Sequence, residues 1–389
     1  MFSSFYRNKR VFLTGHTGFK GSWLAEWLLM LGAEVHGYAL DPQPHEVLFN
    51  QLGLAERLAS DTRADLADRN ALQHALDSAH PDIVFHLAAQ PLVRLSYERP
   101  VETFATNVMG TANLLDAVRV AGRACTVVCV TTDKCYENKE WLHAYREDDP
   151  MGGHDPYSAS KGAAELVIAS YRKSFFTESP ASAAPKIRLA SARAGNVIGG
   201  GDWAADRIIP DCIRALRRSE SIPVRNKIAT RPWQHVLEPL SGYLWLAASL
   251  DKAGSRKSEA EMLDSEFITT PDLQLLASAF NFGPAIASNK TVADLVRELL
   301  QHTDGEWHDV SDPHAKHEAS KLNLSTDKAF HLLGWQPTWE FSETLRKTAE
   351  WYLAEARGDD PQVMTRAQIQ QYAESAARQS IRWASAPPP

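Results

Sequence analysis

The chain has 389 residues, more than one domain usually contains, so we expect two linked units or one large α/β unit with a lobe. Hydrophobic residues make up 44% of the sequence and charged residues 23%, a globular balance that excludes a disordered or fibrous chain. The formal net charge of −7 lacks the basic field that nonspecific binding to nucleic acids or membrane surfaces requires. A local site for a small anion remains compatible with this charge.

The cysteines and the N-terminus indicate the compartment. Cys125, Cys129, Cys135 and Cys212 form no CxxC pair and have no histidine at zinc spacing, so we expect small buried thiols, no disulfide and no metal. No apolar run approaches the roughly 20 residues of a membrane span. Residues 1–5 lead directly into a charged stretch without the apolar core of a signal peptide. These features predict a reduced, cytoplasmic protein that does not contact a membrane.

Short apolar runs alternate with helical patterns through the first half of the chain. Strands are expected at residues 11–13, 35–40, 83–87, 126–131 and 187–193. Apolar side chains at helical spacing predict helices at residues 23–31, 101–120 and 158–176. The alternation favours an α/β fold, a doubly wound parallel sheet that helices cover.

After residue 195 the pattern is less regular, with a glycine-rich turn at residues 199–202, a loop around residue 232 and a late strand at 280–282. We expect a first domain over residues 1–195, to which residues 230–250 return, a smaller C-terminal α/β substrate lobe over 196–360, and a C-terminal tail over 361–389.

A glycine motif, GxxGxxG, lies between the first strand and the first helix. Gly15, Gly18 and Gly21 let the backbone turn tightly and approach a pyrophosphate, whose charge the helix N-terminus favours. Asp41 follows Gly21 by twenty residues, at the end of the second strand. A carboxylate there accepts from an adenosine ribose and repels a 2′-phosphate, which favours NAD over NADP. The competing interpretation is a structural turn and a surface aspartate.

A second constellation is Tyr157-Ser-Ala-Ser-Lys161. Residues four apart share one helix face, and a lysine cation beside a phenol favours the phenolate, so Tyr157 is a candidate base. In most proteins such a pair is a packed tyrosine and an exposed lysine. The order of motifs favours catalysis here, because Thr131 and Thr132 end a strand about 25 residues earlier, after the glycine loop.

Together these motifs resemble the extended short-chain dehydrogenase/reductase family, in the group that modifies nucleotide sugars. The resemblance spans about residues 9–350 and includes Asn107 and the strand end His86-Leu-Ala-Ala89. Longer runs are similar to the 4,6-dehydratases that act on CDP-glucose: GHTGFKGSWL, AAQPLVRLSYE, TTDKCYEN, EDDPMGGHDPYSASKG, RAGNVIGGGDWA and RPWQHVLEPLSGY.

The resemblance implies a Rossmann-type sheet that binds NAD and a lobe that binds the nucleotide sugar. The cofactor residues it implies are Gly15, Gly18, Phe19, Lys20, Gly21, Asp41, Asp65, Leu66, Leu87, Ala88, Ala89, Thr106, Tyr157 and Lys161. The implied reaction converts CDP-D-glucose to CDP-4-dehydro-6-deoxy-D-glucose and water, through oxidation at C4, elimination across C5–C6 and return of the hydride to C6. Tyr157 removes the proton of the 4-hydroxyl, Thr132 bonds the 4-oxygen, and Lys161 binds the nicotinamide ribose while tuning Tyr157.

The elimination requires an acid and a base, and many relatives place Asp-Glu directly after the threonine. Here the pair is Asp133-Lys134. Asp133 serves as the acid if a closed site raises its pKa, whereas Lys134 is a base only when neutral. A charged Lys134 would instead stabilise the developing enolate. A simple salt bridge between the two is the alternative. The Asp-Lys pair matches the CDP-glucose branch, which favours a cytidine substrate.

Six further residues are substrate candidates. Arg231 suits the diphosphate, because a guanidinium binds phosphate oxygens in pairs. Asn196 and Arg207 lie on the segment that the family uses against the nucleotide, and Gln90 and Arg94 follow a strand end that faces the hexose. Surface ion pairing is the alternative for Arg94 and Arg207. His235 is expected to be a structural or substrate-loop histidine.

Apolar faces on helices 101–120 and 158–176 correspond to the four-helix bundle that pairs family members, so a homodimer is implied. The implied role is a step toward deoxysugars of surface polysaccharide, such as lipopolysaccharide O-antigen. The alternatives are a dehydratase or epimerase for another nucleotide sugar and a non-catalytic dinucleotide sensor. Asp133 argues against an epimerase, because epimerases of this fold lack an acidic residue after the threonine. Residues 253–277 and 181–185 depart from the family pattern as insertions.

Overall fold

The computed structural model describes residues 1–42, 47–176, 186–255, 273–311 and 322–385. The expected loop at 181–185, most of the expected insertion at 253–277 and the last four residues lie outside these ranges.

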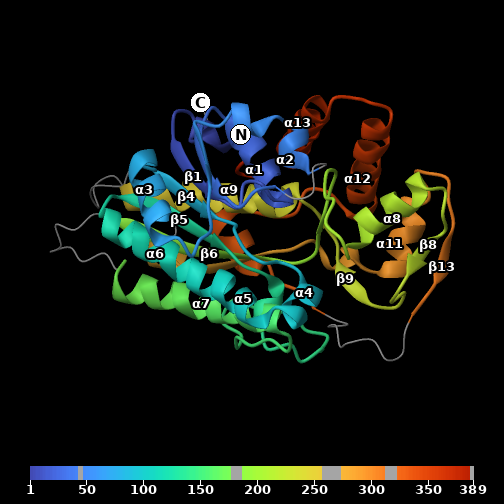
Figure 1. Cartoon of the computed structure of the whole chain (residues 1–389), viewed down its shortest axis with the longest axis horizontal. Coiled ribbons are helices and arrows are strands. Elements are labelled where there is room, and N and C mark those ends of the chain that lie inside the picture. Colours follow the sequence, from blue (N-terminus) through green and yellow to red (C-terminus); the bar gives the residue numbers. More distant parts are fainter. Residues whose placement is uncertain (43–46, 177–185, 256–272, 312–321, 386–389) are drawn as a thin grey trace.

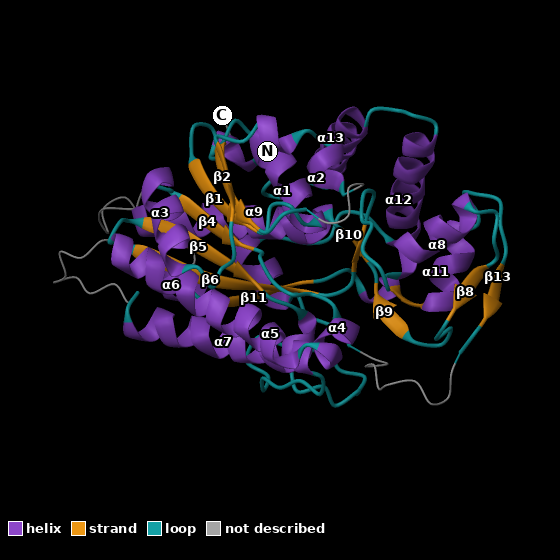
Figure 2. Cartoon of the chain, in the orientation of Figure 1, coloured by secondary structure: helices purple, strands orange, loops and turns teal. Residues whose placement is uncertain are grey.

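A seven-stranded sheet forms the centre of the first domain (Figures 1 and 2). Its strands are β1 (Arg10–Thr14), β2 (Glu34–Ala39), β3 (Ser60–Arg63), β4 (Ile83–His86), β5 (Cys125–Val130), β6 (Ile187–Ala194) and β11 (Ala279–Phe282). They follow the order β11-β6-β5-β4-β1-β2-β3, and every neighbouring pair is parallel. The expected α/β fold is confirmed. The sequence pattern did not reveal β3, because that edge strand, Ser-Asp-Thr-Arg, is polar.

Helices cover both faces of the sheet (Figure 1). One face carries α1 (Phe19–Met30) and α9 (Leu237–Ser255), and the other carries α3 (Arg69–Ala79), α6 (Gly110–Ala121) and α7 (Pro156–Ser174). Alternate side chains of β1 enter different cores, since Val11 and Leu13 pack with α1 and α9 whereas Phe12 packs with α3 and α6. The helix expected at 101–120 is present as α5 (Pro100–Phe104), a π-helical turn η3 (Ala105–Met109) and α6.

A smaller lobe lies beyond the carboxyl ends of the strands (Figure 2). It contains three short strand pairs: β7 (Val197–Ile198) with β10 (Gln234–His235), β8 (Ile222–Val224) with β13 (Trp307–Asp309), and β9 (Thr230–Pro232) with β12 (Asn289–Thr291). Its helices are α8 (Ile208–Arg217), α11 (Val292–Leu299) and α12 (Phe341–Ala356). Thr291 caps α11 through a reciprocal pair of hydrogen bonds with Asp294, which fixes where that helix begins.

The remaining short elements connect these units. They are η1 (Phe2–Ser4), α2 (Leu48–Gln51), η2 (Leu54–Glu56), α4 (Val93–Glu98), η4 (Asp133–Cys135), α10 (Leu273–Leu276), η6 (Ile286–Ser288) and η7 (Ala329–Leu333).

Residues 361–389 were expected to be a tail, but they contain the packed helix α13 (Pro361–Arg378). Ile369, Tyr372 and Ala376 repeat at helical spacing and are buried against α1 and α12. Beyond α13, the ring of Trp383 stacks on Phe2 at 5.1 Å between centroids, and the Phe2 amide donates to the Trp383 carbonyl at 2.6 Å. The two ends of the chain therefore lie side by side (Figure 1).

All four cysteines are buried free thiols, as expected. Among the described residues, no helix has the length and apolarity to cross a membrane, and no group of side chains could hold a metal ion.

Candidate active site

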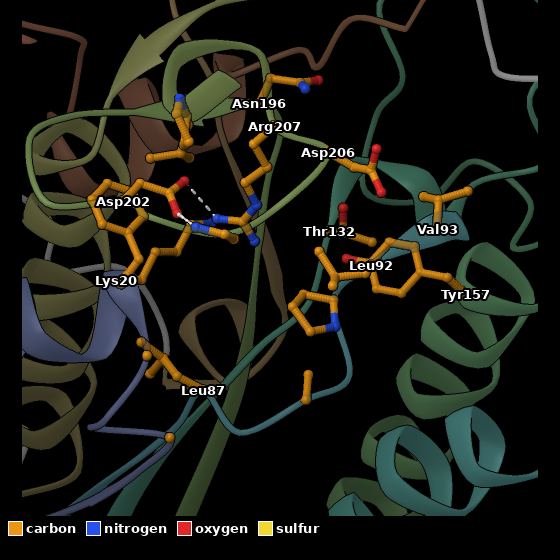
Figure 3. Close-up of a pocket in the computed structure, with 18 of the residues that line it drawn as sticks. Lys20, Leu87, Leu92, Val93, Thr132, Tyr157, Asn196, Asp202, Asp206 and Arg207 are labelled. Carbon is orange, nitrogen blue, oxygen red and sulfur yellow. Dashed lines mark hydrogen bonds and ion pairs between the residues drawn. The ribbon is translucent and has the colours of Figure 1, made fainter. Parts of the chain in front are cut away.

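A cavity of about 660 Å³ lies between the carboxyl ends of the sheet strands and the smaller lobe. In doubly wound folds, ligands bind at this edge of the sheet, and the volume suits an organic ligand of substantial size. Figure 3 shows side chains from both units directed into this space, with Thr132 and Tyr157 facing Lys20, Asp202 and Arg207.

The glycine loop forms the floor of the cavity. Gly15 has a φ of +75°, and a Cβ atom there would lie 2.7 Å from the Ala88 amide nitrogen. A Cβ atom on Gly21 would lie 2.1 Å from the Gly15 carbonyl oxygen. The N-cap of α1 is Gly18, which offers no side-chain cap to the first amides of the helix. This bare helix end beside a tight loop suits a pyrophosphate.

Most of the predicted cofactor residues line the cavity. They are Gly15, Gly18, Phe19, Lys20, Gly21, Asp65, Leu66, Leu87, Ala88, Ala89, Thr106, Tyr157 and Lys161. Asp41 is the exception: it is exposed, and its neighbour Leu40 lines the cavity in its place. The residues present therefore fit an extended dinucleotide, with Asp65 and Leu66 at one end and Lys161 at the other.

The predicted catalytic residues converge at the end of β5 and the start of α7. The Thr132 hydroxyl donates to Asp133 Oδ1 at 2.9 Å. Burial raises the pKa of Tyr157 to about 12, although a hydrogen bond with Thr132 and the charge of Arg207 act in the opposite direction. Burial lowers the pKa of Lys161 to about 8, and its ammonium group donates to the Val130 carbonyl at 3.5 Å. The phenol is thus protonated at neutral pH until a further positive charge reaches it.

Asp133 has the environment of a general acid. It is 2% exposed, and its Oδ2 atom has no hydrogen-bond partner. Burial raises the pKa of this carboxyl group, against the effects of Lys134, the Thr132 hydrogen bond and Arg231. Gly195 provides the necessary room, since a Cβ atom there would lie 2.9 Å from Oδ2. A carboxyl group whose pKa is raised, with one oxygen free of hydrogen bonds in the wall of a ligand cavity, is suited to donate a proton to a leaving group.

Four of the predicted substrate residues also line the cavity: Arg94, Asn196, Arg207 and Arg231. Arg207 pairs with Asp202 at 2.8 Å, shown by dashed lines in Figure 3. Arg231 is buried and donates to the Thr230 carbonyl at 2.8 Å. Arg94 pairs with Asp206 at 3.2 Å.

The structure places Gln90 and His235 away from the cavity wall. The Gln90 amide group donates to Thr103 at 2.9 Å and accepts from the Leu92 amide at 2.6 Å, so it shapes the loop before α4. His235 is fully buried, its ring packs edge-on against Trp339 at 5.0 Å, and burial lowers its pKa to about 3. It is therefore a neutral core histidine.

Several lining residues were missed from the sequence. Asp202, Asp206, Asp211 and Arg225 line the cavity, and Arg225 pairs with Asp206 at 2.6 Å and with Asp211 at 3.0 Å. The basic side chains clustered over residues 225–231 of an acidic chain were the available signal for Arg225. The sequence held no comparable signal for the three aspartates, because their arginine partners are either distant in the sequence or located on another turn.

Two tryptophans, Trp203 and Trp233, also line the cavity. The Trp203 ring packs edge-on against Tyr352 at 5.2 Å, and the Trp233 indole donates to the Lys290 carbonyl at 3.1 Å. Both therefore contribute to packing as well as to the cavity wall.

Known proteins are similar to most of the chain. Residues 12–348 match a family model described as GDP-mannose 4,6 dehydratase. The chain is 46% identical over 378 residues to the CDP-glucose 4,6-dehydratase of Salmonella typhimurium, covering 96% of this chain and 99% of that one. It is 25% identical to the dTDP-D-glucose 4,6-dehydratase of Bos taurus, covering 88% of each.

Solved structures share the fold. DesIV, a dTDP-glucose 4,6-dehydratase from Streptomyces venezuelae with NAD and TYD bound, has a TM-score of 0.72 at 22% identity, covering 91% of this chain and 99% of that one. A UDP-glucose 4-epimerase from Thermotoga maritima with UDP-glucose has a TM-score of 0.70 at 20% identity, covering 89% and 99%.

Proposed function

The chain belongs to the extended short-chain dehydrogenase/reductase family, in the group that the GDP-mannose 4,6 dehydratase model describes, and on this premise we propose that it is an NAD-dependent CDP-glucose 4,6-dehydratase. It converts CDP-D-glucose to CDP-4-dehydro-6-deoxy-D-glucose and water. The observation that carries this proposal is the full-length similarity to a CDP-glucose 4,6-dehydratase combined with Thr132, Asp133, Tyr157 and Lys161 in one cavity.

NAD fits the glycine loop and the cavity residues beside it. The bare end of α1 and the close approach of Gly15 to Ala88 would hold the pyrophosphate, and Lys161 would bind the nicotinamide ribose. Bound NAD supplies temporary storage of a hydride from the sugar, so the net reaction is a dehydration.

The chain's own residues move the protons. Tyr157 takes the proton of the sugar 4-hydroxyl; the Thr132 hydrogen bond and the charge of Arg207 oppose the rise in its pKa that burial causes, and the positive nicotinamide would lower that pKa further. Thr132 holds the 4-oxygen through its hydroxyl. Once C4 is a ketone, the proton on C5 becomes acidic, and Asp133 gives its proton to the departing 6-hydroxyl, which leaves as water. Lys134 lines the cavity and, as a neutral amine, would take the proton from C5 and return it to C5 once C6 is reduced. As a cation it would instead stabilise the enolate, and a separate base would then have to take the C5 proton.

The smaller lobe binds the nucleotide. Arg207 and Arg231 are arginines that line the cavity, and guanidinium groups bind diphosphate oxygens in pairs. Asn196 completes this wall. The cytidine assignment depends on the similarity to the Salmonella enzyme rather than on any single contact.

A homodimer is part of the proposal. Val101, Phe104, Met109 and Leu166 are large apolar side chains exposed on α5, η3 and α7, which lie together on one side of the molecule (Figure 1). Helices with exposed apolar residues suit a four-helix bundle with a second copy. Sedimentation should show that the wild type is a dimer and that the charge introduced by Leu166→Glu dissociates it. A wild-type monomer would contradict the proposed dimer.

A cytoplasmic location and a step toward O-antigen deoxysugars complete the proposal.

The substrate is tested directly by incubating the purified enzyme with NAD and, in turn, CDP-glucose, dTDP-glucose, UDP-glucose and GDP-mannose. The absorbance that 4-keto sugars develop in alkali should appear with CDP-glucose at the highest rate. Faster turnover of dTDP-glucose would overturn the nucleotide assignment, and a C4 epimer without 4-keto product would overturn the reaction.

A further inference from the structure

Glu165 lies behind the catalytic wall of the cavity and takes no part in the proposed proton transfers. It is on α7, one helical turn after Lys161, and its side chain is 5% exposed. Three donors saturate its carboxylate: the Thr131 hydroxyl on Oε1, and the Ser191 hydroxyl and Arg193 Nη2 on Oε2, both at 2.9 Å. These donors come from two segments, since Thr131 follows the end of β5 and Ser191 and Arg193 both lie on β6.

Arg193 carries the network on to the loop that bears the acid. Its Nη1 atom donates to the Tyr136 hydroxyl at 2.7 Å and to the Glu147 carbonyl at 3.0 Å. Tyr136 directly follows η4, which contains Asp133 and Lys134, and its own hydroxyl donates to Asn281 at 2.7 Å. The loop is therefore attached to the same buried ion pair as the strand end.

We infer that Glu165 is a positioning residue: with Arg193 it fixes the strand end that carries Thr132, the loop that carries Asp133 and the helix turn that carries Lys161 relative to one another. The inference rests on the proposed function for the reaction that these residues perform. The geometric basis is that a single carboxylate bonds to one segment directly, to the second through Arg193, and shares a helix with the third. A buried ion pair with every oxygen bonded restricts such segments to one arrangement.

The same carboxylate also acts on Lys161 through its charge. Burial alone would raise the pKa of Glu165. Arg193 and the three hydrogen bonds instead hold this pKa below its usual value, so the carboxylate is ionised. Its negative charge opposes the burial that lowers the pKa of Lys161. The other titratable or charged groups around the pair are Cys129, Cys135, His86, Lys20 and Arg172.

Those neighbours do not replace the charge of Glu165. Burial raises the pKa values of Cys129 and Cys135, so both thiols are neutral, and burial lowers that of His86 to about 3, so the imidazole is neutral as well. Lys20 is a cation or neutral amine, and Arg172 is a cation. Without Glu165, Lys161 would face only neutral or positive groups from these elements and would lose its proton at lower pH.

The first test is Glu165→Gln in the full-length enzyme with NAD and CDP-glucose. We expect kcat to fall about 10- to 100-fold while KM for CDP-glucose changes less than about threefold, because no substrate contact is lost. The alkaline limb of the kcat–pH profile should move to lower pH by about one unit. Glu165→Asp should recover part of both effects. A profile that coincides with the wild-type profile would overturn the inference.

A matched pair of variants covers the case in which Glu165→Gln does not fold. Thr131→Val and Ser191→Ala each remove one hydroxyl donor from the carboxylate of Glu165. Only Thr131 is bonded directly to the catalytic Thr132 in the chain. We expect about a tenfold loss of kcat for Thr131→Val and less than a twofold loss for Ser191→Ala, at similar melting temperatures. Equal losses would indicate a merely structural role.

Binding of NAD, followed by fluorescence titration, separates the two proposals because it needs no sugar substrate. If wild type binds NAD but dehydrates no CDP-glucose, the proposed function fails. In that case Glu165→Gln should still weaken NAD binding in a pH-dependent manner, through Lys161, and unchanged binding would overturn the positioning role independently.

Discussion

The two walls of the active-site cavity hold their charged groups in opposite ways. On the sheet side, Glu165 and Arg193 are each 5% exposed and bond to several elements at once. On the lobe side, Arg207 is 33% exposed and pairs with Asp202, and at the rim Arg94 of α4 is 60% exposed and pairs with Asp206, which is 44% exposed. Buried pairs keep their partners, whereas exposed pairs can exchange them for a ligand at little cost. The first wall is therefore built for fixed geometry and the second for binding.

The largest effect is expected when the proposed acid on the sheet side, Asp133, is replaced. Asp133→Asn keeps the shape of the side chain but removes the transferable proton, so overall turnover should fall about 10²- to 10⁴-fold. The earlier oxidation at C4 does not use Asp133. Adding CDP-glucose should therefore still produce absorbance at the wavelength of NADH, without 4-keto-6-deoxy product.

Tyr157→Phe is the control for this experiment, because it removes the base of the first step and should give neither NADH nor product. Full turnover by Asp133→Asn would show that another group supplies the proton and that the buried carboxyl group is structural.

A smaller effect is expected on the binding wall. Arg207→Gln removes a cation that pairs with Asp202 at 2.8 Å and faces the cavity. Hydrogen bonds to charged groups contribute about 1.5–3 kcal/mol, so KM for CDP-glucose should rise about 10- to 150-fold, with a much smaller change in kcat. Steady-state kinetics at fixed salt measure both. A loss confined to kcat would place Arg207 with the catalytic residues instead.

A buried carboxyl group that does not line the cavity extends the comparison to the pH dependence of stability. Glu238 on α9 accepts hydrogen bonds from the Thr338 and Trp339 amides and from the Tyr372 hydroxyl, and burial raises its pKa to about 7. A pKa raised on folding stabilises the protein at low pH, and this stabilisation is lost as the pH rises from about 4.5 through 7.

We therefore expect the free energy of unfolding to fall by about 2–3 kcal/mol between pH 5 and pH 8 because of this group, since most of the interval between the two pKa values lies in that range and one pKa unit corresponds to about 1.36 kcal/mol. Chemical denaturation at the two pH values measures the fall. In Glu238→Gln the fall should be smaller by that amount. An identical fall in the variant would assign the pH dependence to other groups.

The smallest effect is expected for the exposed pair at the rim. Arg94→Gln removes the bond to Asp206, and exposed ion pairs contribute about 0.2–1 kcal/mol. The melting temperature should change little, and KM should change less than about threefold. A tenfold rise in KM would instead support the sequence-based prediction that Arg94 contacts the hexose. Lys9→Gln is the control, because it removes an ion pair with Asp251 that does not line the cavity and should therefore leave KM unchanged.

Much of the first wall could be predicted because its residues are neighbours in the sequence. The glycines at 15, 18 and 21, the Thr132-Asp133-Lys134 run and the Tyr157–Lys161 pair each lie within one turn, strand end or helix face. Local geometry alone sets their spacing. Only six of the seven sheet strands were recognisable, since β3 lacks the apolar run by which buried strands are identified.

What the sequence determined by itself is the class of fold and the place of the glycine loop, because each depends on periodicity or spacing over a few residues, whereas the proposed reacting groups came from the family resemblance. Only the tertiary structure decided that Gln90 and His235 turn away from the cavity, that Asp202 and Asp206 hold its arginines, and that residues 361–378 form a packed helix. These outcomes depend on contacts between residues more than a hundred positions apart in some cases, as with Arg94 and Asp206. The net charge of −7 excludes general binding to polyanions, yet the chain still brings several arginines together at one cavity. The two facts are compatible because net charge is a sum over the whole chain, whereas a binding site depends on where a few charges meet.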